Sequence, residues 1–198
     1  PSGPVKVWEA KVGTGLAGVA IADGRAVLFH RERNEDRLTA FDVRNGDKLW
    51  TAGIPTSFRP GIIDDDGPRA VPTIHDDAVY AYSADGKLIC VGFKDGEKRW
   101  VRKTHTDFGA DGGYFGAGTA PWVEDSLVIV NVGGNKKRAG IVAFKADSGE
   151  TAWTATDNQA SYSAPVAVTI DGTRHLLCAT RLKFVSLDPA TGKERFQI

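Results

Sequence analysis

The sequence has no methionine, only two cysteines, and no net charge in its 198 residues. Lys plus Arg and Asp plus Glu number 25 each, so no excess of positive charge points to nucleic acid or to an anionic membrane. No apolar run reaches the roughly 18 residues that a membrane-spanning helix needs. The chain begins with Pro-Ser-Gly-Pro, which predicts a processed or excised product.

The two cysteines are far apart and belong to no CxxC motif. Cys90 and Cys178 each stand inside an apolar run. A lone cysteine often behaves as a small core hydrophobe, so this placement favours buried free thiols over a disulfide. Two cysteines are too few to indicate the redox compartment.

The most prominent feature is a thirteen-residue unit that occurs four times. The copies are LTAFDVRNGDKLW, LICVGFKDGEKRW, IVAFKADSGETAW and FVSLDPATGKERF. Each has a glycine four residues before its closing aromatic residue, and these pairs are Gly46 with Trp50, Gly96 with Trp100, Gly149 with Trp153, and Gly192 with Phe196. Self-similarity of this kind indicates a repeat architecture.

A second element precedes each copy, and it consists of a short apolar run, a turn with Asp or Gly, and a β-rich run such as AVLFH or LVIVNV. One full unit therefore contains four strands joined by tight turns. The closing aromatics lie 42, 50, 53 and 43 residues apart, counted from Trp8, which is the period of a four-stranded propeller blade. We therefore expect an all-β fold, a β-propeller of about four antiparallel blades at residues 13–54, 67–104, 114–157 and 160–198. Residues 5–12 would form a strand of a preceding blade.

The D-x-x-x-G-x-x-x-W core, seen at Asp42, Gly46 and Trp50, resembles the pyrroloquinoline-quinone (PQQ) type of β-propeller repeat. This repeat is found in quinoprotein dehydrogenases, in an outer-membrane assembly lipoprotein and in secreted bacterial proteins. The sequence departs from the pattern at Gly92 and Lys145, which replace the aspartate, and at Phe196.

The resemblance implies a structural role for the repeated aromatics, each of which would dock against the neighbouring blade: Trp8, Trp50, Trp100, Trp153 and Phe196. Burying one such ring removes about 150–250 Å² from water. Full members of the family have seven or eight blades. Both ends of the chain fall at the same point of the repeat, which favours part of a larger propeller over a closed ring of four blades. The unpaired strand edges of such a part would bind further blades or a second copy of the chain.

Two motifs suggest chemistry that their surroundings do not support. Residues 13–18 spell GxGxxG, but a turn and a strand follow them instead of the helix that dinucleotide binding requires. Asp64-Asp65-Asp66-Gly67 could begin a calcium loop, but His75 occupies the twelfth position, where such a loop has a glutamate. We therefore expect a solvated acidic loop. The histidines show no zinc spacing, and we assign no catalytic, cofactor-binding or metal-binding residue.

The remaining candidate for binding is the glycine-rich segment 106–118, with Phe108, Tyr114 and Phe115 among five glycines. Trp122 is the one tryptophan outside the repeat register and is a further candidate. Loops on a rigid scaffold often carry binding sites. The alternative is that the aromatics fill the space between blades, and the sequence leaves both readings open.

Two functions follow from these observations. The first is a non-catalytic propeller that serves as a scaffold for protein–protein interaction or envelope assembly outside the cytoplasm, with no cofactor and no nucleic-acid partner. The alternative, which the repeat family implies, is a fragment of a PQQ-dependent dehydrogenase. The dehydrogenases that oxidise alcohols often carry adjacent cysteines, which this chain lacks.

Overall fold

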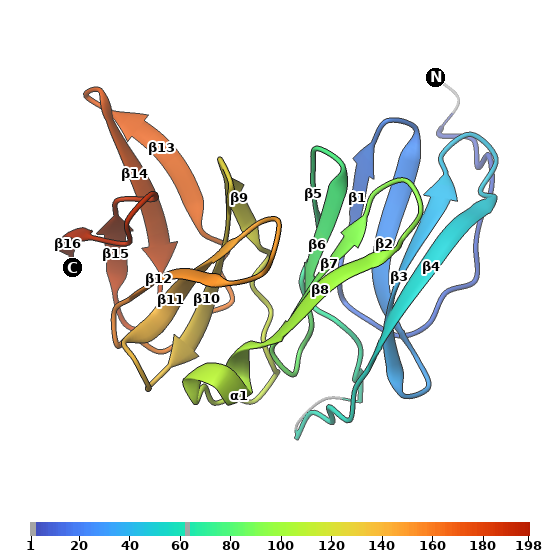
Figure 1. The fold of residues 1–198 in the computed structure, drawn as a ribbon. Helices are drawn as coiled ribbons and strands as arrows, with labels where there is room; N and C mark the ends of the chain where they lie inside the picture. Colours follow the sequence, from blue (N-terminus) through green and yellow to red (C-terminus); the bar gives the residue numbers. More distant parts are fainter. Residues whose placement is uncertain (1–2, 62–63) are drawn as a thin grey trace.

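The computed structural model describes residues 3–61 and 64–198, and these form four antiparallel sheets of four strands each (Figure 1). Within every sheet the strands follow one another in chain order. The prediction of an all-β fold with about four propeller blades is confirmed. The described residues contain one helix, the five-residue α1 (Thr104–Phe108), and none that is long and apolar enough to cross a membrane.

Each sheet corresponds to one copy of the repeat. The first two contain β1 (Val19–Ala22), β2 (Arg25–Glu32), β3 (Glu35–Asp42) and β4 (Lys48–Pro55), then β5 (Thr73–His75), β6 (Ala78–Tyr82), β7 (Lys87–Gly92) and β8 (Lys98–Lys103). The last two contain β9 (Trp122–Glu124), β10 (Leu127–Gly134), β11 (Ala139–Lys145) and β12 (Thr151–Ala155), then β13 (Val166–Ile170), β14 (Thr173–Ala179), β15 (Phe184–Leu187) and β16 (Glu194–Gln197).

Turn chemistry explains why the repeats fold as hairpins. Asp23 and Gly24, between β1 and β2, have φ of 42° and 73°, and Asp171 and Gly172 repeat this geometry between β13 and β14. Two successive positive φ angles make the turn that matches the twist of the paired strands, and aspartate and glycine tolerate them. The glycine of each thirteen-residue unit also has a positive φ.

The apolar core lies between the sheets, in three layers. Val27, Phe29 and Leu38 of the first sheet pack with Val79 and Ile89 of the second. Similar clusters join the second sheet to the third and the third to the fourth. Both isolated cysteines are buried and free, as predicted. Burial raises the pKa of Cys90 to about 11 and of Cys178 to about 12, so both stay as inert thiols at neutral pH.

The four sheets form an open arc and not a closed ring, because the first and fourth lie at opposite sides of the molecule (Figure 1). Apolar side chains on these two terminal sheets remain exposed, among them Ile21 on β1 and Val166 and Ile170 on β13. The structure thus shows part of a propeller, and among the described residues no further sheet covers the outer faces of the first and fourth sheets.

The expected strand over residues 5–12 is not seen, because no strand is assigned over residues 3–13. A β-strand is defined by hydrogen bonds to a neighbour, and no described strand supplies them to this segment. Its place in a preceding blade stays a prediction.

Candidate functional site: the loop rim

Three connections between sheets lie on one side of the molecule, the lower side in Figure 1. We call them the loop rim: residues 56–72, 104–121 and 156–165, apart from 62–63. Ala117 N donates to Ala84 O over 2.8 Å, and Thr119 Oγ1 donates to Ser163 O over 3.1 Å. A β-carbon on Gly116 would lie 2.8 Å from the Phe58 ring. These contacts make the three connections one continuous surface.

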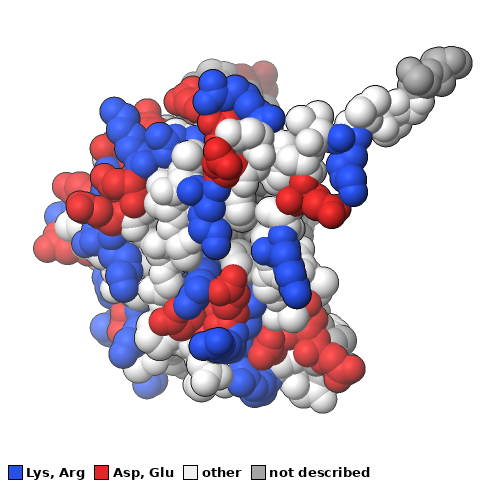
Figure 2. Space-filling view, turned by 90° about the vertical axis from the view of Figure 1, so that its right-hand side faces the viewer, with Lys and Arg blue, Asp and Glu red and all other residues white. Residues whose placement is uncertain are grey.

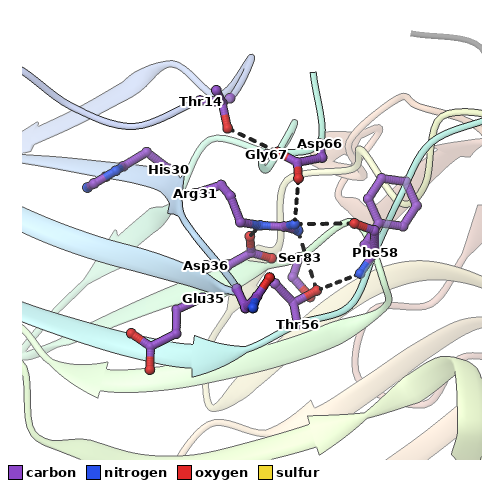
Figure 3. Close-up of polar contacts among 12 residues, drawn as sticks. Thr14, His30, Arg31, Glu35, Asp36, Thr56, Phe58, Asp66, Gly67 and Ser83 are labelled. Atoms are coloured by element: carbon purple, nitrogen blue, oxygen red, sulfur yellow. Dashed lines mark hydrogen bonds and ion pairs between the residues drawn. The ribbon is translucent and has the colours of Figure 1, made fainter. Parts of the chain in front are cut away.

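A buried arginine holds the first connection in place (Figure 3). Arg31, on β2, is 2 % exposed. Its Nε donates to Asp36 Oδ1 over 2.6 Å, and its Nη1 donates to Phe58 O and to Asp66 Oδ2, each over 3.2 Å. Thr56 Oγ1 receives a weaker bond from Nη2 at 3.4 Å. A planar guanidinium that binds several oxygens in this way restrains the chain that carries them.

Asp36, on β3, is fully buried, and its Oδ2 has no hydrogen-bond partner among the described residues. Burial raises the pKa of this carboxyl to about 6, although the hydrogen bond from Arg31 and the charge of Arg31 act in the opposite direction. The ion pair that holds the first connection therefore contains a group that titrates near neutral pH.

The two motifs that the sequence analysis set aside meet in this region. Asp66 Oδ1 accepts a bond from Thr14 Oγ1 at 3.1 Å, and Asp65 Oδ2 accepts one from Gly15 N at 3.0 Å. The prediction of a solvated acidic loop is therefore wrong for Asp65 and Asp66, because their carboxylates are used by neighbouring backbone and arginines. The GxGxxG segment is a loop, as predicted.

The four aromatic candidates occupy different environments. Phe108, in α1, is buried and packs on Phe144, with ring centroids 6.1 Å apart. Trp122 begins β9, packs against the core of the third and fourth sheets, and donates from Nε1 to Glu124 Oε2 over 3.1 Å. Phe115 lies edge-on to Tyr162, with centroids 6.0 Å apart. Tyr114 is 68 % exposed, so Tyr114 and Phe115 are the candidates that reach the surface.

Beside these two residues is a cavity of about 230 Å³ between the second and third connections. The glycine-rich backbone forms one wall, and Asn131, Tyr162 and Arg181 contribute side chains. Asn131 Nδ2 donates to Ala179 O over 3.0 Å, while Asn131 Oδ1 has no partner among the described residues. His105 also lines the cavity, and burial lowers its pKa, which keeps it neutral.

Sequence reasoning missed Asn131, Tyr162 and Arg181 as neighbours of the glycine-rich segment. They come from β10, from the third connection and from the β14–β15 turn. No short motif links them, and only the packing of adjacent sheets brings them together. The cavity presents hydrogen-bond donors and acceptors that come from different repeats.

The repeated tryptophans each contact the following sheet. Their indole N–H groups donate to main-chain carbonyls of the next thirteen-residue unit: Trp8 to Val43 at 2.8 Å, Trp50 to Phe93 at 3.0 Å, Trp100 to Ala146 at 2.9 Å, and Trp153 to Pro189 at 3.1 Å. Each ring also covers the turn glycine of that unit. Phe196 is 43 % exposed and contacts His175 of its own sheet.

The residues that line the rim cavity do not fit a quinone held by calcium. Such a quinone carries several carboxylates and needs several cationic donors, and a hard cation needs a cluster of oxygen ligands. Arg181 is the one arginine on the cavity, and the described residues contain no group of three or more His, Cys, Asp or Glu side chains placed to bind a metal. We derive no catalytic step through this cofactor.

The chain matches the model of a known family. The family model described as "Outer membrane protein assembly factor BamB" matches residues 5–111 and 34–198, which together cover nearly the whole chain. No curated protein sequence matches this chain.

Solved structures with the same fold include both a scaffold and enzymes. BamB from Moraxella catarrhalis is 20 % identical, with a TM-score of 0.62 over 93 % of this chain and 49 % of that one. Quinohemoprotein alcohol dehydrogenase from Comamonas testosteroni is 19 % identical, with a TM-score of 0.64 over 95 % and 35 %. Quinohemoprotein alcohol dehydrogenase ADHIIG from Pseudomonas putida HK5 is 14 % identical, with a TM-score of 0.66 over 96 % and 35 %. This chain spans half or less of their lengths, and at these identities the likeness shows the fold alone.

Proposed function

Because this chain belongs to the family of PQQ-like repeat proteins described as outer membrane protein assembly factor BamB, we propose that it is a non-catalytic scaffold that binds other proteins outside the cytoplasm. The description of the family supports an envelope location and an assembly role. The loop rim is the proposed binding surface.

The observation that carries this proposal is the pair of exposed tyrosines beside the rim cavity. Tyr114 and Tyr162 are both more than half exposed, on two connections that the hydrogen bond from Thr119 to Ser163 holds together. Tyrosine provides a large contact area at a small entropy cost and is enriched at interfaces. The cavity next to them would receive an anchoring side chain of the partner.

The repeated aromatics support a second part of the proposal, namely that Trp8, Trp50, Trp100 and Trp153 dock successive blades. Phe196 has the corresponding place on the last sheet, and its exposed ring would be covered by a further blade or by a second copy of the chain. The exposed apolar residues of β1 and β13 need the same cover.

Photo-cross-linking from single positions tests the rim. A photoreactive amino acid replaces Tyr114 in one variant and Tyr162 in another, and each is irradiated in envelope extracts of the source organism. We expect both positions to capture the same protein. Lys94, which is exposed on the β7–β8 turn at the opposite side, serves as the control and should not capture it. Capture of a protein from the Lys94 position alone, or no capture from either rim position, would contradict the proposal.

The dehydrogenase alternative has a separate test. PQQ and Ca²⁺ are added to the protein, and the quinone absorbance and the reduction of a redox dye by added alcohols are followed. We expect no spectral shift and no dye reduction above the protein-free rate. Dye reduction that depends on both quinone and protein would replace the scaffold proposal with an enzymatic one.

A further inference from the structure

A second surface, away from the loop-rim cavity, combines positive charge with an apolar floor. It lies between β4 and β8, the last strands of the first and second sheets, and encloses a cavity of about 810 Å³. We call it the β4–β8 groove. Its lining includes four cationic residues, Arg59, Lys87, Lys98 and Lys103, and no acidic residue.

The surface next to the groove is mixed in charge. An adjacent cavity shares Lys98 with the groove, and its lining contains Glu35, Asp95 and Glu97 together with Arg37. On the face shown in Figure 2, the side chains of Lys and Arg are likewise interspersed with those of Asp and Glu. The β4–β8 groove, with cations only, differs from both. Local excess of one sign attracts ligands of the other sign.

Two of the four cations have no acidic partner. Lys87 pairs with Asp85, and Arg59 pairs with Asp66 at 3.1 Å. Lys98 and Lys103 form no ion pair with any described residue, and the Lys98 ammonium donates only to Gly53 O, at 3.3 Å. These two ammonium groups remain available to carboxylates of a ligand.

The floor of the groove is apolar and partly open. Ile54 is 4 % exposed and closes the bottom from β4, whereas Val101 is 40 % exposed on β8. Val101 lies between Lys98 and Lys103 in the strand. A matching ligand therefore carries an apolar side chain between two negative charges.

The geometry favours an extended peptide over a compact anion. From Lys98 to Lys103 the strand covers about 17 Å, at about 3.4 Å per residue. β4 and β8 each pair with one neighbour only, so neither has a strand along its outer edge. On β4 the ammonium groups of Lys98 and Lys87 already bind the Gly53 and Pro55 carbonyls, so β8 provides the edge that another main chain would pair with. A nucleic acid or a small anion would use the charges and leave both the apolar floor and this edge unused.

We propose that the β4–β8 groove binds an extended acidic peptide segment of a partner protein, with an apolar residue seated on Val101 and Ile54 and carboxylates at Lys98 and Lys103. This inference rests on the proposed interaction function and adds the chemistry of a second contact, separate from the loop-rim cavity.

The test measures fluorescence anisotropy of the labelled hexapeptide Glu-Asp-Leu-Leu-Asp-Glu with the 198-residue chain. We expect saturable binding that weakens with salt. The double variant Lys98→Glu/Lys103→Glu should lower the affinity about tenfold or more, since it turns two attractions into repulsions. Val101→Asp should lower the affinity to a similar degree.

Lys183→Glu/Lys193→Glu is the matched control, because it makes the same charge change at two exposed lysines of the fourth sheet. Its affinity for the peptide should stay within about twofold of that of the unaltered chain.

Circular dichroism and thermal unfolding confirm that each variant folds, and the substituted residues lie at the surface. Equal affinity of the peptide for the chain and for Lys98→Glu/Lys103→Glu would overturn the proposal. So would equal binding of a (Lys-Leu)₃ peptide, or tighter binding of a twelve-nucleotide DNA strand or of vesicles with anionic lipid.

A fourth variant separates this inference from the proposed function. Tyr114→Ala/Tyr162→Ala changes only the loop rim. If it abolishes peptide binding while the groove variant does not, the groove is excluded and the scaffold function stands. If the rim cross-links fail but the groove binds the peptide, the rim is excluded and the groove stands.

Discussion

The inner and outer sheets of this molecule are built from the same repeat but are buried to very different degrees. Every residue of β6, the second strand of the second sheet, is buried, whereas in β14, the second strand of the fourth sheet, only Leu176 and Cys178 are buried. The difference comes from neighbours, because the second and third sheets are covered on both faces and the terminal sheets on one. One repeat can therefore contribute strongly or weakly to stability, depending on its position in the arc.

Truncation of a core side chain should show the largest contrast. Ile89→Ala removes a fully buried side chain between the first two sheets, and should lower the free energy of unfolding by about 2–5 kcal/mol. Ile170→Ala, on the exposed face of β13, should cost less than about 1 kcal/mol. Urea unfolding of dilute protein measures both. Equal losses would mean that β13 is covered in solution.

The turn glycines separate backbone strain from aromatic packing. Gly96 and Gly24 have the same φ of 73°, but a β-carbon at Gly96 would lie 2.6 Å from the Trp50 ring, whereas at Gly24 it would meet nothing within 4 Å. Gly24→Ala should cost about 1–2 kcal/mol from the left-handed conformation. Gly96→Ala should cost about 1–3 kcal/mol more, because the ring must move. Matching thermal unfolding curves of the two variants would show that the ring contact contributes little.

The closing aromatics give a smaller contrast. Trp153→Phe leaves the buried Pro189 carbonyl without its indole donor and should cost about 1–3 kcal/mol. Phe196→Leu, at the corresponding position of the last sheet, should change stability by less than about 0.5 kcal/mol. If Phe196→Leu proves as costly in urea unfolding, the ring is covered by a second copy, and the loss will depend on protein concentration.

The last contrast is a pH dependence that distinguishes a carboxyl buried in the first sheet from an exposed one. Asp36 has a pKa of about 6, above its ordinary value of 3.8, so the folded state favours its protonated form. The stability from this preference is complete below about pH 4 and is lost as the pH rises through about 6. The stability of the native chain relative to Asp36→Asn should therefore fall over this interval.

Asp77 provides the opposite control. The hydrogen bonds from Arg99 lower its pKa, so its contribution is present above the usual aspartate range and is lost as the pH falls. The free energy of unfolding of Asp77→Asn should therefore lie below that of the native chain at neutral pH and approach it as the pH falls. Urea unfolding at a series of pH values measures both, and the same sign for the two variants would refute the burial argument for Asp36.

The fold could be predicted because its signals are local and repeated. Asp-Gly turns, alternating apolar residues and a glycine four positions before each aromatic recur in register, and each predicts the same hairpins. The loop rim was accessible only in part. Tyr114 and Phe115 were named from composition, but Asn131, Tyr162 and Arg181 come from other repeats, and Asp65 and Asp66 proved to be contacts of Thr14 and Gly15 instead of solvated charges.

The sequence by itself determined the strands, the turns and the family, since these depend on residues close together in the chain. The tertiary structure decided which charges meet. Arg31 binds Asp66 across 35 positions, and Lys98 and Lys103 face a groove that β4 completes from the preceding sheet. Charge interactions depend on distance in space and on burial, and neither can be read from spacing along the chain.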